Sequence, residues 1–189
     1  MASTKLYTVE DLLEMEDDGC RHELIRGELI TKSPAARPHG KLLIELARHV
    51  GNYLADRPIG EAYTGDTGYI LSRDPDVLLA PDLSVIRLER LPDDPPETGF
   101  EDLVPDLVAE VLSPSERMGQ VNYTVWEYLG AGVKLVWLVD PSQRNVAIHA
   151  PDQLMQVIGI DDTLDGGEVL PEFRLLLMEL FTQAAPRHE

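Results

Sequence analysis

The chain has 189 residues, 43% of them apolar, which suffices for one buried core and excludes a disordered protein. A single cysteine, Cys20, excludes a disulfide framework, and no stretch reaches the roughly 18 apolar residues that a membrane span needs. The net charge of −18 argues against broad electrostatic binding of nucleic acid, but basic residues concentrate in the first third and leave room for a local basic groove. We therefore expect a cytoplasmic protein with a single domain over residues 1–189.

The first third of the sequence predicts a helix, a hairpin and a longer helix. A capping-type threonine, Thr8, begins a short helix that extends to Glu16. Two short strands within residues 21–32 meet around Arg26–Gly27, which is a hairpin signal. Leucine and valine residues recur at helical spacing between residues 38 and 54 and predict an amphipathic helix there.

The remaining two thirds predict an α/β core with a right-handed crossover. The mostly apolar run at 107–112 is typical of a central strand buried on both faces. We expect Ser115 to cap the helix that follows, with Met118 in its apolar stripe. The further expected elements are strands within 60–71 and at 83–88, 134–139, 145–150 and 153–158, a surface loop at 90–100, a helix at 116–129, and a short strand and helical turn in the tail to Phe181.

Two acids stand where composition alone would not place them. Asp82 follows a proline at the start of one apolar strand, and Glu110 lies inside another. A charge in a buried strand is costly unless it is paired or binds a metal ion. If the strands are neighbours, both carboxylates and the carbonyl of Val111 would offer hard oxygen ligands to Mg²⁺ or Mn²⁺. The alternative is a structural ion pair between Glu110 and a basic residue.

A series of fragments resembles one known family. They are ELIRGELI, APDLSVI, PDLVAEVLSPSER, EYLGAGVKLVWLVDP and LPEFRLLLMELF, in this order over nearly the whole chain. The series is similar to the Uma-type restriction endonucleases, a branch of the PD-(D/E)XK nuclease superfamily. The resemblance implies a restriction-endonuclease-like mixed sheet flanked by helices, with an N-terminal β-hairpin and helix. It also implies that Asp82 and Glu110 hold a divalent metal ion while water attacks a DNA phosphodiester, and it favours a homodimer.

The sequence departs from the family pattern at the lysine. Most of the superfamily carries it two residues after the motif glutamate, which is Leu112 here. The Uma-type branch carries it on the next helix, four residues before the tyrosine that corresponds to Tyr128, and this position is Thr124. A threonine hydroxyl orients water weakly and cannot offset charge in the transition state. We therefore expect weak or absent nuclease activity, which Thr124→Lys should raise and Asp82→Ala or Glu110→Ala should abolish.

Several side chains are candidates to replace the lysine or to join the site. Gln120 would position a water, and a surface role is the alternative for every residue in this group. The other candidates to replace the lysine are Arg117, Lys32 and Lys41, and Glu23, Glu28 and His39 are candidates for the mouth of the site.

Two further hypotheses stand beside the endonuclease. One is a catalytically impaired relative that serves as a binding or interaction module, which the missing lysine and the acidic charge favour. The other is a structural dimer subunit without a metal ion. In all three cases, two carboxylates that converge without metal should repel each other, and at least one should have a raised pKa.

Overall fold

The structure, a computed structural model, describes residues 5–184 except 66, 96–97 and 115. Its helices are α1 (Val9–Leu13), α2 (Arg37–Asp56), α3 (Met118–Ala131) and α4 (Leu177–Ala184), with a 3₁₀ turn at Leu88–Arg90. Its strands are β1 (Arg21–Ile25), β2 (Glu28–Lys32), β3 (Gly60–Thr64), β4 (Tyr69–Ser72), β5 (Val77–Leu79), β6 (Leu83–Arg87), β7 (Leu107–Val111), β8 (Leu135–Asp140), β9 (Asn145–His149), β10 (Gln156–Ile158), β11 (Thr163–Gly166) and β12 (Leu170–Leu176).

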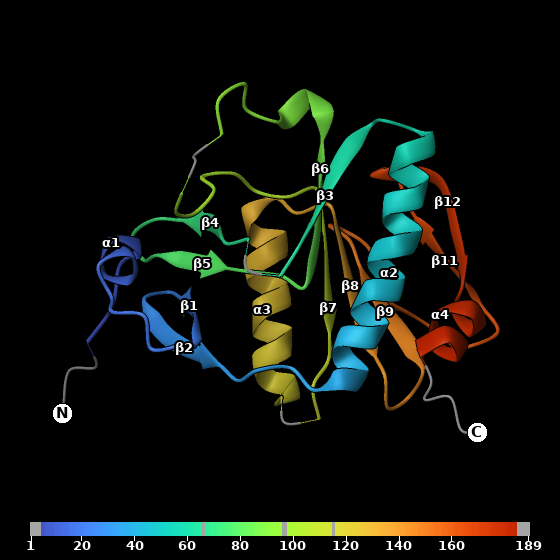
Figure 1. The fold of residues 1–189 in the computed structure, drawn as a ribbon, viewed down its shortest axis with the longest axis horizontal. Helices are drawn as coiled ribbons and strands as arrows, with labels where there is room; N and C mark the ends of the chain where they lie inside the picture. Colours follow the sequence, from blue (N-terminus) through green and yellow to red (C-terminus); the bar gives the residue numbers. More distant parts are fainter. Residues whose placement is uncertain (1–4, 66, 96–97, 115, 185–189) are drawn as a thin grey trace.

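A mixed sheet forms the centre of the fold, with the strand order β10-β9-β8-β7-β6-β3. Its one parallel pair is β7–β8, which α3 connects, and the other neighbours are antiparallel. Alternate side chains of β7 enter two cores. Leu107 and Ala109 pack with α2, α4 and the β11–β12 pair, whereas Val108 packs with α3 and the second sheet. Figure 1 shows α3 on one side of the central sheet and α2 with α4 on the other. This alternation decides which layer each polar residue of the strand faces.

The N-terminal hairpin belongs to the second sheet, whose order is β2-β1-β5-β4. Its turn residues Arg26 and Gly27 have φ values of 51° and 78°, as a two-residue turn between right-twisted strands requires. A side chain at Gly27 would lie 3.3 Å from the Tyr7 carbonyl oxygen, so the close approach of the N-terminal segment also needs glycine. The hairpin carries the end of β2 toward the ends of β6 and β7.

Most of the predicted elements are confirmed, including the Thr8 capping box, the hairpin and the antiparallel edge pair β9–β10. The predicted start of α3 is wrong, because the helix begins at Met118 with Arg117 as an N-cap that makes no side-chain hydrogen bond. Ser115, the expected cap, lies outside the described residues. Met118 was expected in the apolar stripe, but it is 55% exposed because the first turn of α3 projects beyond the core. Across the described ranges, none of the helices combines the length and apolar character that crossing a membrane requires.

Candidate active site

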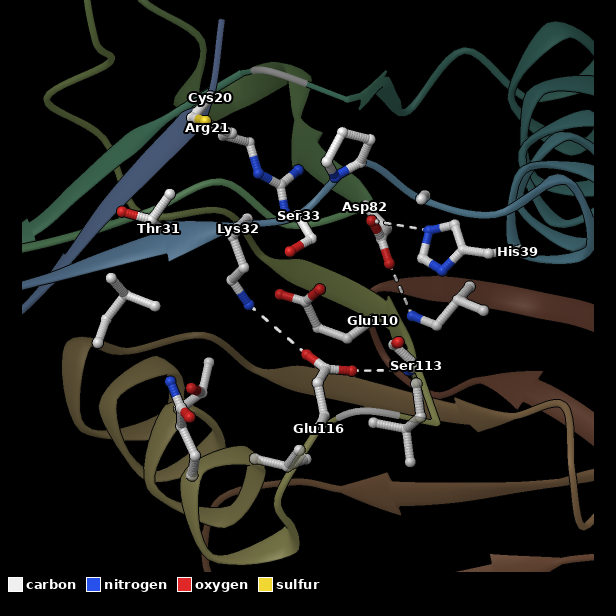
Figure 2. A pocket seen from close by; sticks show the side chains of 18 of the residues that line it. Cys20, Arg21, Thr31, Lys32, Ser33, His39, Asp82, Glu110, Ser113 and Glu116 are labelled. Carbon is white, nitrogen blue, oxygen red and sulfur yellow. Dashed lines mark hydrogen bonds and ion pairs between the residues drawn. The ribbon is translucent and has the colours of Figure 1, made fainter. Parts of the chain in front are cut away.

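The two acids that the sequence singles out lie opposite each other across neighbouring strands. Leu83 pairs with Ala109 in the antiparallel β6–β7 ladder, so the next position along sets Asp82 across from Glu110. Both side chains point to the α3 side of the central sheet, because their neighbours Leu83 and Ala109 point to the α2 side. Asp82 and Glu110 line one pocket with a volume of about 1350 Å³ (Figure 2).

Each carboxylate is oriented by a specific donor. The amide of Val111 donates to Oδ2 of Asp82 at 2.8 Å, and Nε2 of His39 lies 3.3 Å from Oδ1. The hydroxyl of Tyr128 donates to Oε1 of Glu110 at 2.7 Å. The hydrogen bond with Asp82 is the largest cause that raises the pKa of His39 above its usual value. Strand β7, helix α2 and helix α3 therefore converge on the two acids.

The surroundings of Glu110 disfavour the ionised form of its carboxyl group. Burial is the largest cause that raises its pKa, and the negative charges of Asp82 and Glu23 add to it. The result is a pKa of about 8, although Lys32 and the Tyr128 hydroxyl act in the opposite direction. The direction of this shift is the one expected for one of two converging acids, although burial contributes more to it than the neighbouring charges. Proton or cation binding at Glu110 relieves the repulsion.

A second group of charges adjoins the acid pair on the hairpin side. Glu23 is only 3% exposed and accepts a hydrogen bond from the amide of Ala80 at 3.3 Å. Nζ of Lys32 lies 3.4 Å from Oε2 of Glu23 and 3.6 Å from Oε1 of Glu116, whose other oxygen accepts from the amide of Ser113. Figure 2 shows Lys32, Glu116, Glu110 and Asp82 directed into the same space.

The other predicted site residues divide into two groups. Thr124 and Gln120 line the pocket from α3, and Val111 lines it from β7. His39, in α2, and Arg117, just before α3, also line the pocket. Lys41 is outside the lining, and Glu28 is exposed on the hairpin.

The donor set of the pocket suits a hard divalent cation. Asp82 and Glu110 provide carboxylate oxygens, the ligands that Mg²⁺ and Mn²⁺ prefer, and their mutual repulsion would be offset by positive charge. Among the described residues, no group of three or more acidic, histidine or cysteine side chains is arranged to hold an ion. A cation held by these two carboxylates alone would leave its further coordination positions to water and substrate.

Two features of the site were not settled by the sequence. Tyr128 was identified only as the counterpart of the family tyrosine, and the structure shows that its hydroxyl orients Glu110. Glu23 was left open between a site acid and an exposed hairpin charge, and it is buried. The alternation along β1 gave a signal for Glu23, since it shares a face with the buried Ile25.

Comparison with known proteins identifies the family. A crystal structure described as that of "a putative nuclease belonging to DUF820" from Anabaena variabilis ATCC 29413 has a TM-score of 0.82. It is 23% identical in sequence, and the match covers 94% of this chain and 99% of that chain, which shows a common fold. None of the curated proteins matches the chain. The Uma2 family model, described as "Putative restriction endonuclease", matches residues 9–179, a span that includes the hairpin, Asp82, Glu110 and Thr124. The chain therefore belongs to the Uma2 family.

Proposed function

We propose that this protein is a metal-dependent DNA endonuclease with Asp82 and Glu110 as its paired carboxylates. The observation that carries the proposal is their cross-strand placement in one pocket, where burial and then repulsion raise the pKa of Glu110 to about 8. A strongly perturbed acid in a pocket is typical of a functional site. The descriptions of the family and of the Anabaena protein both name nuclease chemistry and support the proposal.

The reaction is hydrolysis of a phosphodiester. The oxygen of a water molecule forms a bond to phosphorus, one ester bond to a sugar oxygen breaks, and one proton of the water ends on the departing oxygen. A divalent cation would supply positive charge to the phosphate and activate the attacking water. In this scheme Asp82 and Glu110 would hold the cation, and the Val111 carbonyl would offer a further oxygen.

The surrounding side chains keep these groups in place. The Val111 amide and the Tyr128 hydroxyl restrict the rotamers of the two acids, which preorganises their oxygens. On the pocket side of α3, Gln120 and Thr124 would orient water.

Basic residues within the pocket offer contacts to DNA phosphates. Arg21, Lys32, His39 and Arg117 line it, although the same lining also contains the acids Glu16, Asp17, Asp18, Asp82, Glu110, Glu116 and Asp140. Cations at these positions would contact phosphate oxygens on either side of the cleaved bond. The acidic remainder of the surface would favour short, local contact with DNA over binding along its length.

A plasmid-nicking assay with Mg²⁺ or Mn²⁺ tests the proposal. We expect the wild type, which lacks the family lysine, to nick supercoiled DNA weakly, EDTA to stop the nicking, and Asp82→Asn and Glu110→Gln each to abolish it. The matched control is Glu28→Gln, which neutralises an exposed acid outside the pocket and should cleave like the wild type. Titration calorimetry with Mn²⁺ should show binding that both site variants lose. Cleavage that survives in both variants would refute the proposal, and metal binding without cleavage would favour a binding module.

We also propose a homodimer. Strand β10 ends one side of the central sheet, and edge strands are prone to pair with another chain. Three apolar side chains near it are largely exposed, namely Leu154 at 96%, Met155 at 57% and Val157 at 54%. Sedimentation at about tens of micromolar should show a dimer, and Val157→Lys should convert it to a monomer if this edge is the interface.

A further inference from the structure

Lys32 occupies a defined position beside the two acids. It is the last residue of β2 and pairs with Arg21 in the hairpin register, which turns its side chain to the same face as Glu23. Its side chain is 25% exposed, so it is neither enclosed nor free in solvent. The buried Glu23 holds the ammonium from one side and Glu116 from the other, at 3.4 and 3.6 Å.

The charge of this ammonium acts on the acid pair. Burial lowers the pKa of Lys32, but Glu23, Glu110 and Glu116 outweigh it and keep the pKa above its ordinary value. Lys32 in turn lowers the pKa of Glu110. The lysine is therefore protonated at neutral pH and is the cation whose charge reaches the carboxylate at the centre of the site.

We propose that Lys32 is a catalytic residue, whose ammonium contacts a phosphate oxygen of the substrate and stabilises the negative charge that develops during cleavage. The inference rests on the proposed nuclease function. In the hydrolysis described above, Lys32 neither gains nor loses a proton. It supplies fixed positive charge beside the reacting phosphorus, which is the contribution that Thr124 cannot make from α3.

The neighbouring cations are less suited to this role. Arg21 is paired with the opposite oxygen of Glu23, at 3.5 Å, and Arg117 lies on an exposed part of the chain before α3. Lys32 differs from both because it reaches the pocket from β2, across from the helix that carries Thr124. Its two carboxylate partners fix the ammonium between them while leaving one quarter of the side chain accessible to a ligand.

The test compares Lys32→Met, which keeps the length of the side chain but removes its charge, with Lys32→Arg, which keeps the charge. Lys5→Met is the matched control, since Lys5 is exposed and outside the pocket. We expect Lys32→Met to lower kcat for a short duplex by about a hundredfold with little change in KM. Lys32→Arg should retain more activity than Lys32→Met, and Lys5→Met should cleave like the wild type.

Two further measurements separate catalysis from folding. Lys32→Met should bind Mn²⁺ at least as tightly as the wild type, because removal of a nearby positive charge favours a bound cation. A Lys32→Ala variant should recover part of its cleavage when ethylammonium is added, whereas a folding defect would not respond. Circular dichroism of each variant checks that it is folded.

The outcomes distinguish this inference from the function on which it rests. Wild-type cleavage that depends on Asp82 and Glu110 but is unchanged in Lys32→Met overturns the role of Lys32 alone. Weaker Mn²⁺ binding in Lys32→Met, or no response of Lys32→Ala to ethylammonium, also overturns it. Absence of cleavage in the wild type overturns the nuclease function and the role of Lys32 with it.

Discussion

The two ends of strand β7 carry acids in opposite electrostatic states. Asp106, just before the strand, is fully buried, and it accepts a hydrogen bond from the Arg87 amide at 2.9 Å. Arg90 and Lys134 lie 2.9 and 2.8 Å from its other oxygen. Burial acts to raise the pKa of Asp106, but these donors and cations outweigh it and hold the pKa below its usual value. Glu110, near the other end, has a pKa raised to about 8.

The difference separates an acid whose charge the fold compensates from one whose charge it leaves uncompensated. At Asp106 the fold supplies the compensating charges itself, and the acid joins the end of β7 to the segments before β8 and after β6. At Glu110 burial and two like charges outweigh the Tyr128 hydroxyl and the charge of Lys32, so the folded chain loses stability there. An acid that weakens the fold is the kind expected where a cation or substrate completes the charge balance.

The sharpest test of the comparison is Asp106→Asn. The amide keeps the shape of the carboxylate but leaves the partly exposed Arg90 and Lys134 without their charge partner. Because solvent screens both cations, we expect the free energy of unfolding to fall by about 1.5 to 3 kcal/mol, measured by urea denaturation at pH 7. Asp93→Asn, in an exposed loop, should change it by less than about 0.5 kcal/mol. If Asp106→Asn proves as stable as this control, Asp106 does not have the structural role described here.

Glu110→Gln should act in the opposite direction and depend on pH. The carboxyl of Glu110 has a pKa of about 8 in the folded chain against a reference value of 4.5. Below pH 4.5 the carboxyl is protonated in both the folded and the unfolded chain, so it does not lower the free energy of unfolding. Between pH 4.5 and about 8 the unfolded chain ionises first, so stability falls as pH rises.

The glutamine variant should remove this fall in stability. Because Glu110 keeps partial exposure, we expect a gain in unfolding free energy on the order of 2 kcal/mol near pH 8 and none near pH 4. Urea denaturation of both proteins at several pH values measures the difference. Parallel pH profiles for the wild type and Glu110→Gln would contradict the raised pKa and the contrast with Asp106.

The fold could be predicted from the sequence where local patterns decide it. Apolar periodicity located α2, β7 and β8, and the Arg26–Gly27 turn located the hairpin. The short strands β5 and β11 were missed, because three or four residues carry too little pattern to separate a strand from a loop. The start of α3 was misplaced because Ser115 is a common capping residue, whereas the helix begins without any side-chain cap.

The candidate site was only partly predictable for a different reason. Asp82 and Glu110 stand out because each is an acid in an apolar run, so one sequence position is enough to notice them. Lys32 and Glu23 matter only because the β1–β2 register turns both toward the ends of β6 and β7. Such a contact depends on how two sheets meet, which no local pattern encodes. The Arg90–Asp106–Lys134 group was missed for the same reason.

The smallest effect is expected from Thr124→Lys. This substitution would add a positive charge near Glu110, as Arg90 and Lys134 provide at Asp106. Thr124 lines the pocket from α3, and lysine favours helix slightly more than threonine, so the change should be tolerated. If Lys32 already supplies the positive charge, the new lysine should raise cleavage by less than about tenfold in the wild type. In the Lys32→Met background, Thr124→Lys should raise the cleavage rate by more than about tenfold, because either lysine can stabilise the same negative charge in the transition state. Cleavage rates of the four proteins, measured with Mg²⁺ under identical salt, give the coupling. An equal gain in both backgrounds would mean that the two positions act independently, and that the deficit at the Glu110 end is not a single missing charge.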